Sequence, residues 1–218
     1  MIISINKPIG FSSFDIVKII RKITNQSKVG HGGTLDPFAD GVLIIAIGRE
    51  STKKISEFIN SNKEYIATLK LGSETDTLDV NGKIIKSKKI PNISKKDINN
   101  VFMQFLGNID QKTPMYSARK ISGMRLYKYA RKNIIIKTPI NKVKIFDLNL
   151  ISYNDELLKF KVKCSKGTYI RQLAYDISKK LGTTGHLINL TRTKVGNFSL
   201  ENSKKISDFK KQWIAITE

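Results

Sequence analysis

A run of six apolar residues, VLIIAI at 42–47, limits most strongly what this chain can fold into. A membrane-spanning helix needs about 20 predominantly apolar residues, so the run is far too short to cross a bilayer. A short, continuous apolar run between turn residues is typical of a β-strand buried in a protein core. We therefore expect a sheet with 42–47 as one of its interior strands.

Helical and strand patterns are mixed along the rest of the chain. Ser12 and Asp15 have the spacing of a capping box, and the apolar residues that follow recur with helical period, which predicts a helix. Alternating apolar residues predict a strand at 64–72, and the Asn-Gly pair at 81–82 predicts a hairpin turn after it. The remaining patterns predict helices at 50–60, 95–106, 125–133 and 167–182, and paired strands at 142–153 and 157–165. Because strands and helices do not alternate strictly, we expect a single α+β domain over 1–218, with a mixed, mostly antiparallel central sheet flanked by helices and loops.

The charge of the chain indicates a polyanionic partner. Lys and Arg number 39 against 18 Asp and Glu, which gives a net charge of +21. Such an excess favours nucleic acid or an anionic membrane surface, and the lack of a long apolar segment or a signal peptide argues against the membrane. Cys164 is the only cysteine, which excludes an intramolecular disulfide and fits the cytoplasm. His31 and His186 have no metal-ligand spacing with each other or with the cysteine, which argues against a zinc site.

The segment GHGGTLDPFADGVL at 30–43 holds the first candidate for chemistry. An Asp-Pro pair such as Asp36-Pro37 commonly initiates a turn, which is the simpler interpretation. The glycines around it would also let a ligand approach the backbone closely, so Asp36 is a candidate nucleophile or base. His31, in the same segment, is either an ordinary surface side chain or one that contacts a base.

Three other regions carry residues that suit contacts with RNA. Tyr65 opens a predicted strand, and Tyr169 and Arg171 lie near the start of a predicted helix. Each has a structural interpretation as a packed or surface side chain, and a functional one in stacking on a base or pairing with a carboxylate. Residues 110–132 interleave basic and aromatic side chains, which suits unpaired RNA as well as an ordinary solvated loop.

In residue order and spacing, the 30–43 segment resembles the catalytic motif of the TruB-type tRNA pseudouridine synthases, which isomerise uridine 55 in the T-loop of tRNA to pseudouridine. The resemblance covers nearly the whole chain. The other matching segments are NKPIGFSS at 6–13, EYIATLKLGSETDTLD at 64–79, TPMYSARKISGMRLYKYAR at 113–131, CSKGTYIRQLAYDI at 164–177 and HLINLTRTKVGNFSL at 186–200.

The resemblance implies a role for individual residues. Asp36 is then the catalytic carboxylate, which acts on a flipped-out base. The other implied contacts are Tyr65 stacking on the target base, Arg171 pairing with Asp36, Tyr169 and Leu190 lining the base pocket, and His31 near the displaced base pair. Residues of about 110–132 correspond to the RNA-binding thumb of the family, with Tyr116, Arg119, Lys120 and Arg131 as its candidate contacts.

The resemblance also implies a monomer that acts on tRNA without a cofactor, a metal or an obligatory protein partner. Many bacterial members continue into a C-terminal RNA-binding PUA domain, and we expect none here because the tail after 200 is short. Asp40 stands where members commonly have Thr, and we expect it to face away from Asp36. The alternatives are an RNA chaperone for tRNA, a role that can coexist with catalysis, a guide-RNA-dependent synthase, and a generic basic RNA-binding module.

Overall fold

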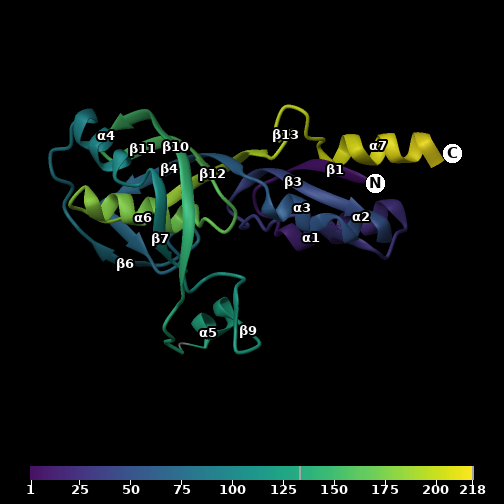
Figure 1. Cartoon of the computed structure of the whole chain (residues 1–218), viewed down its shortest axis with the longest axis horizontal. Helices are drawn as coiled ribbons and strands as arrows, with labels where there is room; N and C mark the ends of the chain where they lie inside the picture. Colours follow the sequence, from purple (N-terminus) through teal and green to yellow (C-terminus); the bar gives the residue numbers. More distant parts are fainter. Residues whose placement is uncertain (133, 218) are drawn as a thin grey trace. The chain divides into compact units, whose positions relative to one another are not determined.

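The computed structural model describes residues 1–132 and 134–217, and the chain divides into two compact units. Unit 1 comprises Met1–Ile66 together with the C-terminal segment from Asn189, and unit 2 comprises Ala67–Ile188. Two strands, β4 (Lys63–Leu71) and β12 (Gly185–Val195), each run from one unit into the other, as the chain trace in Figure 1 shows.

Unit 1 is a sheet with helices on it. Strand β1 pairs antiparallel with β3, and β12 pairs with β3 in parallel over a short stretch. The short strand β2 pairs antiparallel with β3, and the short strand β13 pairs antiparallel with β12. The elements that lie wholly in this unit are β1 (Ile2–Lys7), α1 (Ser13–Thr24), β2 (Val29–His31), β3 (Asp40–Ile47), α2 (Arg49–Lys53), α3 (Ile55–Asn60), β13 (Phe198–Ser199) and α7 (Ile206–Thr217).

The apolar run 42–47 forms most of the buried strand β3, as predicted, and this part is apolar throughout because both of its faces are covered. Leu43, Ile45 and Ile47 pack into the core formed with α1 and α7. Val42 and Ile44 point the other way, into a smaller core with Val195 and with side chains of α3 and β13. A strand whose successive side chains point to opposite faces, both buried, has no position left for a polar residue.

Unit 2 is built on an antiparallel sheet. β10 pairs with β11 on one side and with β7 on the other. α4 packs on β10 and α6 on β7 (Figure 1), and the rings of Phe102 on α4 and Phe160 on β11 meet edge to face at 5.9 Å, a contact that adds about 1 kcal/mol beyond the buried area. The elements of this unit are β5 (Ser73–Thr75), β6 (Ile84–Ser87), α4 (Lys95–Met103), β7 (Gly107–Lys112), β8 (Lys120–Ile121), β9 (Met124–Arg125), α5 (Leu126–Arg131), β10 (Ile140–Asn154), β11 (Leu157–Cys164) and α6 (Ile170–Lys180).

The observed architecture confirms the α+β class, with a mostly antiparallel sheet in which β12 and β3 pair in parallel. Capping boxes begin both α1 and α4, where Ser12 bonds to Asp15 and Ser94 to Asp97. None of the helices in the described part of the chain has the length and apolar character needed to cross a membrane.

Some predicted boundaries were wrong. The helix predicted at 95–106 ends at Met103, and the one predicted at 50–60 is two short helices, α2 and α3. The helix predicted at 125–133 is α5 over Leu126–Arg131, and residue 133 lies outside the described residues. The 110–132 segment, for which an ordinary solvated loop was one interpretation, contains the end of β7, a small hairpin of β8 and β9, and α5.

The hairpin predicted around 81–82 is present, but its turn is not the two-residue Asn-Gly type. β5 pairs with β6, and the residues from 76 to 83 connect them. Aspartate side chains hold this loop, since Asp79 Oδ1 accepts from the backbone N–H of Asn81 at 3.0 Å and Asp76 Oδ1 accepts from that of Lys83 at 2.9 Å. Side-chain acceptors of this kind compete with tight-turn geometry and lengthen the loop.

Candidate active site

Asp36 opens a tight turn in the loop between β2 and β3. The backbone N–H of Ala39 donates to the Asp36 carbonyl at 3.1 Å, with Pro37 in the second position of the turn. The preceding residue, Leu35, is held at both of its backbone groups by the buried Ser13 hydroxyl, at 2.8 and 3.0 Å. The turn interpretation and the functional one are therefore compatible, because the turn presents a half-buried carboxylate on a fixed backbone.

A buried arginine braces the same loop from the side. The Arg192 side chain is 1% exposed, and it donates to the carbonyls of Val42 at 2.7 Å and Gly33 at 3.0 Å, one on each side of Asp36 in sequence. Its strand approaches so closely that position 41 must be glycine. Gly41 has a φ of +102°, and a Cβ built there would lie 2.8 Å from the Arg192 nitrogen and closer still to its carbonyl oxygen.

Replacing Gly41 by alanine is expected to destabilise the protein by at least about 2 kcal/mol, because it adds left-handed strain to a backbone clash. For a chain of this size that corresponds to a fall in Tm of roughly 4–8 °C, measured by thermal denaturation. Gly48→Ala is the matched control, since Gly48 has a similar φ of +87° but nothing within 4 Å of a built Cβ. If Tm fell equally in the two variants, the close approach of the Arg192 backbone would not contribute to the destabilisation.

A second buried cation, Lys7, lies at the end of β1. Its side chain is inaccessible to solvent and donates to the carbonyls of Pro8 and Phe11, both at 2.8 Å. Burial lowers the pKa of Lys7 to about 8, against the opposing effect of the Asp40 and Asp36 carboxylates, and the Arg192 cation lowers it further. Lys7 therefore stays mostly protonated at pH 7, and it contributes positive charge close to Asp36.

Three other predicted site residues belong to unit 1. Tyr65 lies on β4 and Leu190 on β12, with exposed fractions of 8% and 5%. Their burial fits a pocket lining and equally a sheet core. His31 ends β2 and is half-buried. The predicted base contacts of these three side chains stay predictions.

Arg171 lies in the first turn of α6 in unit 2 and is 4% exposed. Its guanidinium donates to the carbonyls of Thr77 at 2.6 Å and Tyr116 at 2.8 Å, and it forms an ion pair with Asp79 at 3.3 Å. One side chain thus ties the loop after β5 to the segment after β7. Asp36 belongs to the other unit, and its predicted pairing with Arg171 stays a prediction.

Tyr169 caps the start of α6, where its backbone is fixed by a buried amide. Gln111 on β7 is inaccessible to solvent, accepts from the Tyr169 N–H at 2.8 Å and donates to its carbonyl at 3.1 Å. The Tyr169 side chain remains half-buried. This arrangement leaves the phenol ring available for a contact while the backbone that carries it is held.

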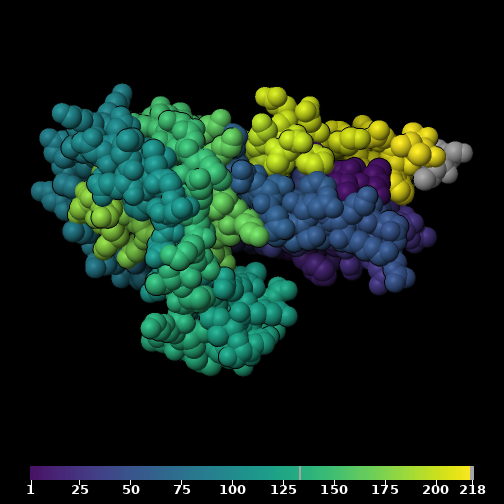
Figure 2. Space-filling view, in the orientation of Figure 1, coloured from purple at the N-terminus to yellow at the C-terminus, as the bar shows by residue number. Residues whose placement is uncertain are grey.

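The predicted thumb corresponds to a projecting part of unit 2. We call residues 113–132, with β8, β9 and α5, the thumb segment, and Figure 2 shows it standing out as a lobe in teal and green. At its base the Tyr116 hydroxyl donates to Asp76 at 3.3 Å, and burial together with that carboxylate raises the pKa of Tyr116. Arg119, Lys120 and Arg131 are exposed, as a role in binding phosphates requires.

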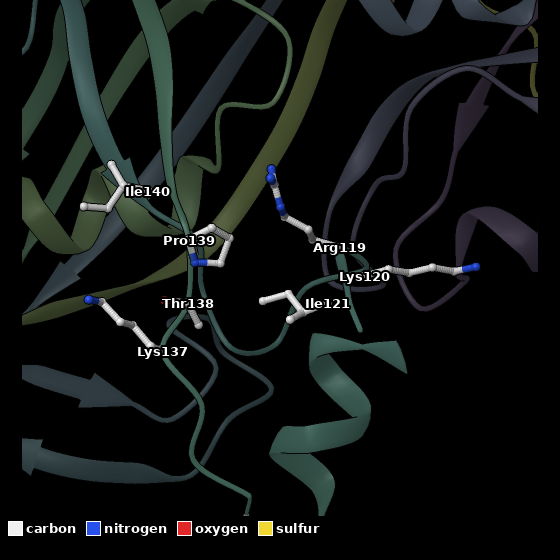
Figure 3. A pocket seen from close by; sticks show the side chains of 7 residues that line it. All are labelled: Arg119, Lys120, Ile121, Lys137, Thr138, Pro139 and Ile140. Carbon is white, nitrogen blue, oxygen red and sulfur yellow. The ribbon is translucent and has the colours of Figure 1, made fainter. Parts of the chain in front are cut away.

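A hollow of about 560 Å³ lies where the thumb segment meets the start of β10. Figure 3 shows Arg119 and Lys120 on one side of it and Lys137 on the other, with apolar side chains between them. Arg119 also donates to Asn141 Oδ1 at 2.6 Å. The lining residues are Arg119, Lys120, Ile121, Lys137, Thr138, Pro139 and Ile140.

Sequence reasoning missed several residues that shape the site. Lys7 and Arg192 lie inside two of the quoted motifs but were not singled out, because Lys and Arg are normally exposed and nothing local marks these as buried. Asp79 and Gln111 were missed because their partners are 92 and 58 residues away in sequence. Among the described residues, no three His, Cys, Asp or Glu side chains are placed to hold a metal ion.

Comparisons with known proteins agree on one family. Residues 21–170 match the family described as TruB family pseudouridylate synthase (N terminal domain). The tRNA pseudouridine synthase B of Clostridium tetani is 47% identical over 211 residues, covering 97% of this chain and 73% of that protein. The tRNA pseudouridine synthase B of Protochlamydia amoebophila is 46% identical over 202 residues, covering 92% of this chain and 76% of that protein.

A solved structure, the crystal structure of a Cbf5-Nop10-Gar1 complex, contains a chain similar to this one. The two superpose with a TM-score of 0.78 at 28% identity over the whole of this chain, which spans 55% of that chain's length.

Proposed function

Since this chain belongs to the TruB family of pseudouridylate synthases, we propose that it isomerises uridine 55 in the T-loop of tRNA to pseudouridine. The observation that carries the proposal is Asp36, a carboxylate on a braced turn beside two buried cations, within the span that matches the family. The net charge of +21 suits a polyanionic substrate.

The reaction exchanges one bond for another. The bond from C1′ of the ribose to N1 of uracil breaks, the base turns, and a bond from C1′ to C5 forms. The C5 proton is lost and N1 gains one, so the product is an isomer of the substrate and no oxidant or energy source is consumed. A carboxylate suits this chemistry because it can attack covalently or accept a proton and then leave again. We assign that role to Asp36 without choosing between the base and the sugar as its point of attack.

The other predicted residues receive roles around a flipped-out base. We assign Tyr65 to stacking on the uracil, with Tyr169 and Leu190 as walls of the pocket. Arg171 pairs with Asp36 in this proposal, and His31 occupies space near the displaced base pair. Flipping a base costs a few kcal/mol, which stacking and loop contacts must offset.

The substrate is held through its phosphates by the thumb segment, with Tyr116, Arg119, Lys120 and Arg131 as its contacts. We propose that the enzyme acts as a monomer in the cytoplasm. It needs no protein partner in this proposal, in contrast to the Cbf5 chain, whose crystal structure is that of a complex with Nop10 and Gar1.

Tritium release tests the activity. A tRNA transcript labelled at C5 of uridine should release one tritium per molecule on incubation with the chain, because C5 loses its hydrogen when it bonds to C1′. A transcript with cytidine at position 55 should release none. A tRNA chaperone, or a generic RNA-binding module, would bind both transcripts and release nothing from either.

Removing two thumb charges is expected to weaken tRNA binding and to flatten its salt dependence. With Lys120 and Arg131 both changed to alanine, the slope of log K against log salt should fall in magnitude by roughly 0.7–0.9 for each phosphate that the variant no longer neutralises. Binding is measured at four or more salt concentrations.

The matched control removes two exposed lysines from α7, Lys210 and Lys211, and should leave the slope unchanged. If the salt slope of the thumb variant were also unchanged, Lys120 and Arg131 would not contact RNA phosphates, and the thumb segment would not be part of the RNA interface.

A further inference from the structure

Three large apolar side chains are exposed within six consecutive residues just before and at the start of α1. Ile9, Phe11 and Phe14 are 56%, 42% and 51% exposed. Single exposed apolar side chains are common on soluble proteins, but three within six residues, two of them aromatic, make this segment a candidate interaction surface. We call these three residues the apolar patch.

The backbone that carries the apolar patch is tied to the candidate catalytic turn. The N–H of Gly10 donates to the carbonyl of Pro37, the residue after Asp36, at 2.8 Å. The carbonyl of Phe11 accepts from the buried Lys7 ammonium at 2.8 Å. The backbone of the patch and the backbone of the Asp36 turn are therefore parts of one braced structure, so the patch is carried by a segment that neighbours the candidate catalytic turn.

Two cations lie close to one ring of the patch, that of Phe14. The Lys18 ammonium lies 5.2 Å from the centre of the Phe14 ring, and the Arg21 guanidinium lies 5.9 Å from it. Aromatic faces combined with cations suit an unstacked nucleotide, which offers a π-face and a phosphate together. This charge favours RNA over an uncharged apolar partner.

We propose that the apolar patch stacks on an unpaired base next to the target uridine, while Lys18 contacts a neighbouring phosphate. The inference rests on the proposed function, since it takes the reacting nucleotide to be seated at Asp36. Stacking of this kind offsets part of the cost of unstacking the RNA loop around the flipped base.

The test replaces both rings without removing the apolar surface. In Phe11→Leu/Phe14→Leu the affinity for a tRNA transcript should fall about fivefold or more, because stacking is lost. Phe11→Tyr/Phe14→Tyr should bind within about twofold of the wild type. Neither variant should change the affinity for a blunt RNA duplex of equal length, which offers no unpaired base inside its helix. Ile216→Ala, which removes another exposed apolar side chain of unit 1, is the control and should bind both RNAs as the wild type does.

Two results would overturn the proposal. If the leucine variant kept its affinity for tRNA, the rings would not stack on RNA. If its affinity fell equally for tRNA and for the duplex, the substitutions would act on phosphate contacts in general. Tritium release by the wild type is scored separately. If the wild type releases tritium but the leucine variant binds tRNA with unchanged affinity, only the role of the apolar patch is contradicted. If the leucine variant binds tRNA more weakly but the wild type releases no tritium, only the proposed activity is contradicted.

Discussion

Replacing Asp36 by asparagine is expected to abolish pseudouridine formation while leaving tRNA affinity within about tenfold, about 1.4 kcal/mol. Asparagine keeps the size of the side chain and its ability to start a turn, so the loop braced by Ser13 and Arg192 should survive. It lacks the charge and basicity that a nucleophile or proton acceptor needs. Tritium release over several hours with excess enzyme measures turnover, and filter binding measures affinity.

The matched control for this variant is Asp40→Asn. Asp40 is the second carboxylate beside Lys7 and begins β3 only four residues after Asp36. It should retain tritium release, because we assign no catalytic step to it. Tritium release retained in the Asp36 variant, or lost equally in both variants, would contradict the assignment of Asp36 as the catalytic carboxylate.

Replacing Arg171 by lysine is expected to lower the rate of pseudouridine formation tenfold or more, with a smaller loss of tRNA affinity. The planar guanidinium donates to the carbonyls of Thr77 and Tyr116 and pairs with Asp79 at the same time. A compact ammonium cannot make all three contacts in that geometry. Lysine keeps the charge, so Asp79 is not left as an uncompensated buried carboxylate, which would cost about 3–5 kcal/mol. Single-turnover rates, dissociation constants and Tm are measured on the same preparation.

Arg119→Lys is the control for this change, because Arg119 is an exposed arginine of the thumb segment. It should leave the single-turnover rate near that of the wild type. If Arg171→Lys reduced affinity and rate by equal factors, Arg171 would be a phosphate contact and not a positioning residue for catalysis.

The sequence predicts this fold well wherever a local pattern is self-sufficient. The apolar run of β3 and the Ser12-Asp15 box at α1 each depend on residues close together in the chain, and both form as predicted. The Asn-Gly pair failed as a turn predictor because Asp76 and Asp79, outside the pair, hold a longer loop. In addition, a Cβ at Gly82 would lie 2.9 Å from the Thr77 nitrogen, so glycine is needed here because the Thr77 backbone packs close to it.

The site was predictable only in part, for a similar reason. The glycines and the Asp-Pro pair of the 30–43 segment drew attention to Asp36 from local features alone. Lys7 and Arg192 act through burial, which depends on strands β1, β3 and β12 coming together. Asp79 and Gln111 act through partners far along the chain. No local period or spacing encodes contacts of this kind, so a single sequence cannot reveal them.

The measurement that tests the central claim most directly is the position of pseudouridine in a tRNA transcript after incubation with the whole chain. A carbodiimide that marks pseudouridine, followed by reverse transcription, reports every modified site at nucleotide resolution. We predict one modified site, position 55, that depends on the enzyme and is absent with Asp36→Asn. A transcript that stays unmodified, or one modified only elsewhere, would contradict the assignment of this chain as a tRNA pseudouridine-55 synthase.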